Sequence, residues 1–430
     1  MAQVTVYQEP TIAGWLTNQV VEVGDDVTLA VQAVGTPTLG YVWDWNGVPL
    51  PGSAPTLTLA HVSVAQSGYY RVTVTNQFGS ASSSARVSVL GLPAPVVAWG
   101  DDSGGQTRVP DDLTDAVAVA GGDYHSLALR HDGTLVAWGY DGDGQTRVPT
   151  NTQRFVAVAA GGAHNLALLE SGALVAWGRD DQGQTNIPAA ASSNLLAIAA
   201  GDAHSLALLA SGTVVAWGDD TFGQTAVPPG LSGVAAITAG RLDSLALRTN
   251  GTVVGWGFNA FGQSTAPAGL SNVVAVAPGY LHSVALLANG TVIAWGDNTY
   301  GQTNVPAGLT NVVAIAAGDF VTFALRADGS VVAWGDDAYG ETDVPPAVRN
   351  AVAVAAGNYH GLALVPAGLG LQLRLTAGGV VVRWDGAGVL QWAPAVVGPF
   401  TDVPSPGNPF TNVDMGVPIR FFRVSRGSAP

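Results

Sequence analysis

The sequence predicts an all-β protein built from three parts, and three observations support this prediction. A Trp-Gly pair returns seven times between Trp99 and Trp334, at intervals of 39 or 40 residues. Short apolar runs and Asp-Gly or Asn-Gly turns fill each interval. In the first 91 residues, short segments alternate apolar and polar side chains, the two-residue period of half-buried strands.

Residues 1–91 are expected to form a β-sandwich. Apolar side chains alternate in 27–31, and Trp43 and Tyr70 lie in later strand-like runs. This segment resembles the immunoglobulin fold in its intermediate-set form, with Trp43 at the core tryptophan position. Tyr70 stands two residues before Val72, the spacing of a tyrosine corner. Val31 and Val72 occupy the family's two cysteine positions, so the resemblance implies a sandwich without a disulfide, with these two valines facing each other.

Residues 95–368 contain the repeat. One unit reads as a strand (116–119), Gly-x-x-His, a second strand (126–130), an Asp-Gly turn of the primed type and a third strand (134–138), followed by Gly-Gln-Thr-x-Val-Pro. A period of about 40 residues indicates one four-stranded propeller blade per repeat. The chain enters the repeat with a second half-unit and leaves it with a first half-unit. We therefore expect 95–110 to pair with 351–368 and close a seventh blade, because neither half satisfies its strand edges alone.

The recurring Gly-x-x-His-Ser-Leu-Ala-Leu and Trp-Gly-x-Asx-x-x-Gly-Gln motifs resemble the regulator of chromosome condensation repeat. This family forms seven-bladed propellers. Its eukaryotic namesake is a nucleotide-exchange factor that binds chromatin, but those activities depend on insertions and basic segments that these uniform blades lack. The Gly-Gln-Thr-x-Val-Pro variant is similar to secreted bacterial propellers that inhibit β-lactamases through an aromatic-rich face. That similarity implies protein binding, without naming the target.

Residues 369–430 are expected to form a small β-module and a polar tail. Candidate strands lie at 371–375, 380–384, 390–392 and 419–424, punctuated by proline and glycine.

Composition limits the function. The net charge is −15, all sixteen basic residues are arginine and cysteine is absent. Nucleic acid and anionic membranes are therefore unexpected partners, and no apolar run is long enough to span a membrane. The start of the chain is not a signal peptide, so the protein is either cytosolic or has lost a signal; the resemblance favours a secreted or cell-surface protein. Motifs for nucleophilic, metal-dependent or phosphate-binding catalysis are missing, and we expect neither an enzyme nor a cofactor.

The repeated polar residues are expected to be structural. Histidine recurs at one place in five blades (125, 164, 204, 282 and 360), with Asp243 and Val321 in the other two. Symmetric positions on a ring cannot converge on one metal, so each histidine is expected to bond to the backbone of its own blade. The Asx after each Trp-Gly pair is expected to cap a turn. Calcium at Asp141-Gly-Asp143 is the alternative, but a closing glutamate is missing, and we expect no metal site.

Residues that break the repeat are the candidates for function. The Gly-x-x-His and Asx loops should open on one face, which would then collect aromatic and acidic side chains. The alternative is that these aromatic side chains are structural and pack against the tops of the blades. The candidate ligand-binding residues are Asp123, Tyr124, Tyr140, Arg179, Phe222, Arg241, Phe258, Phe261, Tyr280, Tyr300, Asp319, Phe320, Tyr339 and Tyr359.

Within this set, Tyr124, Phe320 and Tyr359 should lie nearest the axis, and Tyr140, Tyr300 and Tyr339 farther out. Asp123, Asp319 and Asp336 are expected to act as rim charges. The predicted function is non-catalytic recognition of a protein partner. A glycan ligand, or self-assembly as a structural subunit of an envelope or filament, are the alternatives.

Overall fold

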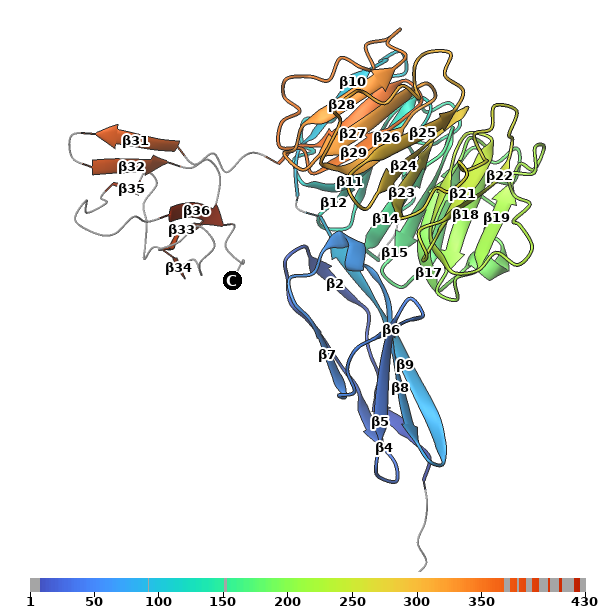
Figure 1. Ribbon diagram of the computed structural model, residues 1–430, viewed down its shortest axis with the longest axis vertical. Coiled ribbons are helices and arrows are strands. Elements are labelled where there is room, and N and C mark those ends of the chain that lie inside the picture. The colour runs from blue at the N-terminus through green and yellow to red at the C-terminus, as the bar shows by residue number, and fades with distance from the viewer. Residues whose placement is uncertain are drawn as a thin grey trace, which may run out of the picture. The chain divides into compact units, whose positions relative to one another are not determined.

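The computed structural model describes residues 8–91, 93–150 and 153–366, and beyond these the backbone of six strands between 372 and 425 (Figure 1). Within these residues the protein is all-β apart from two single-turn 3-10 helices, Val64–Gln66 and Ala189–Ala191. No helix in this part of the chain is long and apolar enough to span a membrane.

The N-terminal domain is an immunoglobulin-like sandwich. Its strands are β1 (Thr11–Gly14), β2 (Gln19–Glu22), β3 (Val27–Ala30), β4 (Gln32–Val34), β5 (Gly40–Trp45), β6 (Val48–Leu50), β7 (Thr56–Leu59), β8 (Gly68–Asn76) and β9 (Gly79–Leu90). They form a five-stranded sheet in the order β2-β9-β8-β5-β6 and two strand pairs, β3-β7 and β1-β4.

The sandwich core contains the expected residues. Trp43, Val31 and Val72 are buried in one apolar cluster, so the two valines fill the space of the missing disulfide. The Tyr70 hydroxyl donates a hydrogen bond to the Gln66 carbonyl at 2.9 Å, which is the predicted tyrosine corner.

The repeat forms a seven-bladed propeller. Six blades are consecutive in the chain: β11 (Ala116–Gly121), β12 (His125–Arg130), β13 (Leu135–Gly139); β14 (Phe155–Ala160), β15 (His164–Leu169), β16 (Leu174–Gly178); β17 (Leu195–Ala200), β18 (His204–Leu209), β19 (Val214–Gly218); β20 (Val234–Ala239), β21 (Asp243–Arg248), β22 (Val253–Gly257); β23 (Val273–Pro278), β24 (His282–Leu287), β25 (Val292–Gly296); and β26 (Val312–Ala317), β27 (Val321–Arg326), β28 (Val331–Gly335). They are blades 1 to 6 in the text below.

Blade 7 joins the two ends of the repeat. β10 (Val96–Gly100) pairs with β30 (His360–Leu364), which also pairs with β29 (Ala353–Ala356). The Trp99 indole donates to the Glu341 carbonyl at 2.8 Å and packs edge-on against Phe323 of blade 6. Both half-units therefore have paired edges only when the ring is closed.

The blades have three strands, not the four that the repeat length suggested. The segment after each Trp-Gly pair forms tight turns. Its side-chain oxygens accept hydrogen bonds from the backbone amides that would otherwise pair with a neighbouring strand. In blade 1, Asp141 accepts from the Thr146 amide at 3.1 Å, and the buried Gln145 accepts from the Asp143 amide at 2.9 Å. The predicted turn-capping role of the Asx residue is thus present in the structure.

The hairpin turns are also not of the primed type. At Asp132-Gly133 only the glycine has a left-handed backbone, with φ +83°, and its amide donates to the Arg130 carbonyl at 2.9 Å. This is a type I turn followed by a left-handed glycine, the arrangement of a longer hairpin loop.

Beyond Val365 a separate compact unit begins. Its described strands are β31 (Gln372–Thr376), β32 (Gly379–Arg383), β33 (Val389–Ala393), β34 (Thr401–Asp402), β35 (Phe410–Thr411) and β36 (Phe421–Ser425). Four of them overlap the candidate strands, while Leu371, Trp384, Ile419 and the tail 426–430 lie outside the described residues.

Candidate functional site

The Gly-x-x-His and Asx loops open on one end of the propeller, which we call the loop face. In blade 1, His125 at the start of β12 pairs with Gly139 at the end of β13. The Tyr140 amide donates to the Tyr124 carbonyl at 2.8 Å, so the two loops lie together. The Asp132-Gly133 turn lies at the other end of the same strands.

Backbone atoms from all seven blades meet around the axis of the loop face. The residue after each Gly of Gly-x-x-His donates its amide hydrogen to the next blade, as Asp123 does to the Gly162 carbonyl at 3.1 Å and Asn358 does to the Gly122 carbonyl at 3.2 Å. A Cβ atom on Gly161 would lie 2.3 Å from the Gly201 carbonyl oxygen. Glycine is required here because the loops approach too closely for a side chain.

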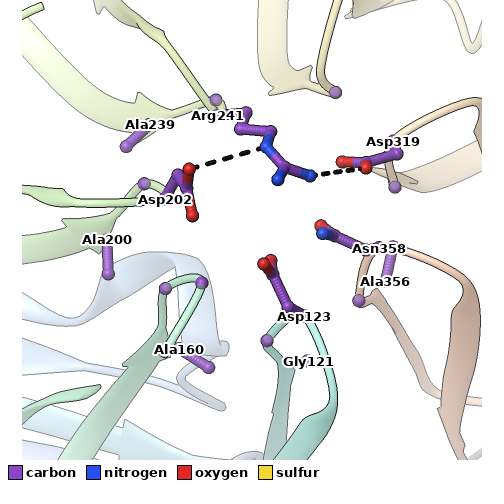
Figure 2. A pocket seen from close by; sticks show the side chains of 18 of the residues that line it. Gly121, Asp123, Ala160, Ala200, Asp202, Ala239, Arg241, Asp319, Ala356 and Asn358 are labelled. Carbon is purple, nitrogen blue, oxygen red and sulfur yellow. Dashed lines mark hydrogen bonds and ion pairs between the residues drawn. The ribbon is translucent and has the colours of Figure 1, made fainter. Parts of the chain in front are cut away.

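These loops surround a central cavity of about 110 Å³, lined by the strand ends and glycines of all seven blades. Arg241 reaches across it from blade 4 (Figure 2). Its guanidinium Nη1 lies 2.8 Å from an Asp319 carboxylate oxygen, and its Nε lies 3.5 Å from Asp202. Asp123 and Asn358 point into the same cavity from the opposite side (Figure 2).

The cavity perturbs its own acids. The pKa of Asp123 is raised to about 7, mainly by burial; the negative charge of Asp202 contributes to the rise and the positive charge of Arg241 opposes it. Burial likewise raises the pKa of Asp319 to about 6, although its ion pair with Arg241 lowers it. Asp123 and Asp319 are therefore not the rim charges expected from sequence, since the inner loop positions turn toward the axis.

The five recurring histidines link neighbouring blades. Each histidine Nε2 atom lies 2.8–3.0 Å from a side-chain oxygen in the next blade. That oxygen belongs to the residue that directly follows the histidine position of the next blade: Asn165, Ser205, Ser244, Thr322 or Ser126. In the bond from His164 to Ser205, the serine hydroxyl donates to the Gln184 carbonyl. Its only hydrogen is used there, so the imidazole is the donor. The expected bond to the backbone of the same blade is wrong, because the ring points across the blade interface.

In the two blades without this histidine, the replacing residue makes no such hydrogen bond to the described residues of the next blade. Blade 6 carries Val321 at the histidine position, and the residue in blade 7 that would accept a histidine's hydrogen bond is Gly361, which has no side-chain oxygen. Glycine is needed there because a Cβ atom would lie 2.4 Å from the Trp99 ring. In blade 4, the Asp243 carboxyl is fully buried, and neither oxygen has a hydrogen-bond partner among the described residues. Burial raises the Asp243 pKa well above its ordinary value.

Seven of the aromatic candidates form three clusters of ring contacts on the loop face. Around blades 5 to 7, Tyr280 and Tyr300 both contact Phe320, with ring centroids 5.9 and 4.9 Å apart, and Tyr339 contacts Tyr359 at 5.5 Å. Phe222 and Phe258 form a second pair at 5.1 Å. Tyr300 and Tyr339, which are expected to lie farther from the axis than Tyr124, Phe320 and Tyr359, each contact one of these inner aromatic residues.

Exposure separates the candidates further. Exposed on the loop face are Tyr124, Tyr140, Arg179, Phe222, Phe261, Tyr300 and Tyr339. Half-buried are Asp123, Arg241, Phe258, Tyr280, Phe320 and Tyr359, whereas Asp319 is buried. The sequence-based candidates do not include Asp202 and Asn358, although both occupy the same loop position as Asp123, Arg241 and Asp319.

Two family models match the two described domains of the chain. The model of the regulator of chromosome condensation (RCC1) repeat matches the six unsplit blades, at residues 116–145, 155–184, 196–224, 234–263, 273–302 and 312–341. The immunoglobulin I-set domain model matches residues 10–89. The chain carries RCC1 repeats behind an immunoglobulin I-set domain.

Two solved structures illustrate how far the fold is shared. Yeast RCC1 (Prp20), in its structure bound to Kap60, is 20% identical over 63% of this chain and 88% of that one, with a TM-score of 0.55. Human WBSCR16 is 18% identical over 64% of this chain and 99% of that one, with a TM-score of 0.53. These likenesses establish the fold alone.

The immunoglobulin part also has a curated relative. Vascular endothelial growth factor receptor 2 of Danio rerio is 42% identical over 84 residues, which are 18% of this chain and 6% of the receptor. The chain therefore spans a small fraction of that relative.

Proposed function

We propose that this protein is a non-catalytic recognition module, secreted or at a cell surface, that binds a protein partner through the loop face of its propeller. The observation that carries the proposal is the group of contacting aromatic rings beside the central cavity. On the loop face, Tyr124, Tyr300 and Tyr339 remain 40–57% exposed. Aromatic side chains of this size contribute a large apolar area when a partner protein covers them.

The character of the surface supports a protein interface. Tyrosine and phenylalanine beside charged groups are typical of the binding centres of protein complexes. Yeast RCC1, which shares the propeller fold, was solved with Kap60 bound. The secreted or cell-surface location is supported by the likeness of the immunoglobulin domain to part of a growth factor receptor.

Affinity capture with matched variants tests this proposal. The full chain and a Tyr124→Ala, Phe320→Ala, Tyr359→Ala variant are each immobilised and exposed to the native medium or cell surface. A partner should be retained by the wild type and lost by the variant. Truncation of one central anchor commonly costs about 2 kcal/mol, or about thirtyfold in affinity.

An opposite-face variant is the control. Asp132→Asn with Asp328→Asn leaves the Asx turns in place and should retain the same partner. Loss of binding in this control, with binding unchanged in the aromatic variant, would show that the loop face is not the binding surface. Binding to a glycan array, or filaments in electron micrographs, would support the alternative functions.

A further inference from the structure

The loop face has an excess of negative charge that its own arginines do not neutralise. Its four arginines are already engaged: Arg108 pairs with Asp102, Arg147 with Asp141, Arg179 with Asp181, and Arg241 with Asp202 and Asp319. Among the described residues, Asp123 has no ion-pair partner. A cation supplied from outside would therefore complement the cavity.

Aromatic residues stand next to the cavity-lining residues in these loops. Tyr124, Phe320 and Tyr359 directly follow Asp123, Asp319 and Asn358, so each ring belongs to a loop that also lines the cavity. A cation within about 6 Å of a ring centroid is attracted to the ring face. The structure already contains one such contact, with the Arg241 guanidinium 5.0 Å from the centroid of Tyr280.

The size of the cavity fits a side-chain head group. Its volume of about 110 Å³ holds several waters, which a guanidinium or ammonium group can displace. The described residues contain no group of three or more side chains arranged to hold a metal ion. The charge also disfavours phosphate or another anion.

We propose that the partner is a protein with a protruding basic loop, whose arginine or lysine side chain enters the central cavity toward Asp123 while the loop packs on Tyr124, Phe320 and Tyr359. This inference rests on the proposed function and adds the chemistry of the partner. The aromatic rings supply the apolar contact area, and the Asp123 carboxylate, which has no ion-pair partner among the described residues, selects the positive charge.

The test uses short loops as the probe. A library of disulfide-closed seven-residue loops displayed on phage is selected against the full-chain protein at pH 8. Loops that fail to bind the Tyr124→Ala, Phe320→Ala, Tyr359→Ala variant are retained for sequencing. We expect arginine or lysine at one common position of these loops.

A synthetic loop then isolates the charge. Replacing its arginine by citrulline, which is neutral and similar in shape, should weaken binding at least tenfold. Asp123→Asn should weaken binding of the arginine loop to a similar extent and leave the citrulline loop almost unaffected, because the two changes remove one interaction. Asp132→Asn removes the same charge on the opposite face and should change binding less than twofold.

The pH dependence gives a second readout. The groups facing Asp123 are Asp202, Arg241, Asp319 and Asn358. Since the pKa of Asp123 is raised to about 7, the arginine loop should bind more tightly at pH 8 than at pH 6. Asp123→Asn should reduce that difference.

The outcomes are distinguishable. Selected loops that need the aromatics but lack a basic residue would overturn this inference and leave the proposed function standing. Basic loops that are insensitive to both citrulline and Asp123→Asn would also overturn it. If no selected loop depends on the aromatic residues, both proposals are wrong.

Discussion

The Nε2 atom of His360 lies 2.9 Å from the Oγ atom of Ser126, and this hydrogen bond joins blade 7 to blade 1. Ser126 in turn donates to the Gln106 carbonyl, which also accepts the Trp138 indole N–H at 2.8 Å. A short buried network therefore crosses the place where the two ends of the repeat meet.

Removing the Ser126 hydroxyl should destabilise this closure. Ser126→Ala leaves the His360 N–H without its acceptor in a buried site, at a cost of about 1–3 kcal/mol. Urea unfolding of the full chain measures the change in the free energy of unfolding.

Ser283→Ala is the matched control for this prediction. Ser283 also donates to a glutamine carbonyl, at 2.9 Å, but the blade before it carries Asp243 in place of histidine. Its substitution should cost less than Ser126→Ala. Equal losses would show that the histidine bond contributes little.

Asp243→Asn should stabilise the protein, increasingly so as pH rises. The folded state raises the pKa of Asp243, so its stabilising contribution is complete below the unfolded pKa of about 3.9 and is lost as pH rises through the folded value. Asparagine cannot ionise, so we expect a gain on the order of 1–3 kcal/mol at pH 8. The measurement is the free energy of unfolding of both proteins at pH 4 and pH 8. A gain that is the same at both values would contradict the assignment of a buried ionisable carboxyl.

The buried histidines should make the propeller sensitive to acid. Burial lowers the pKa of His164 and His360 to about 3, and that of His204 and His282 to about 4. Depressed folded values mean that this stability is fully present above the unfolded pKa of about 6.5 and is lost as pH falls through 4 to 3. Unfolding measured from pH 7 to pH 3 should show the loss, and the imidazole NMR signals should stay those of the neutral form at pH 5. Protonation of these four rings near pH 6 in the folded protein would contradict this prediction.

A disulfide should form in the immunoglobulin domain when Val31 and Val72 are both replaced by cysteine. Both valines are buried against Trp43 in one cluster, where the resemblance to the immunoglobulin fold places the bridge. The oxidised variant should gain about 2–4 kcal/mol, and reduction should abolish the gain. Free thiols that persist after oxidation would show that the two positions do not face each other.

The sequence by itself determined the blade period, the tryptophans that join the blades and the immunoglobulin core. These follow from local patterns: Trp43 and Tyr70 stand at fixed distances from their neighbours, and Trp99 begins a series that repeats every 39 or 40 residues. The aromatic character of the loop face was also predictable, because loops at equivalent positions of a repeat lie on the same end.

Tertiary structure decided what depends on contacts between blades. No spacing indicates that Arg241 reaches Asp319, 78 residues away, across the axis. The histidines bond to the next blade, and Asp123 turns inward, because the blades surround a common axis and their glycines bring the loops together. A repeat pattern describes one blade at a time, whereas charge compensation in the cavity depends on all seven.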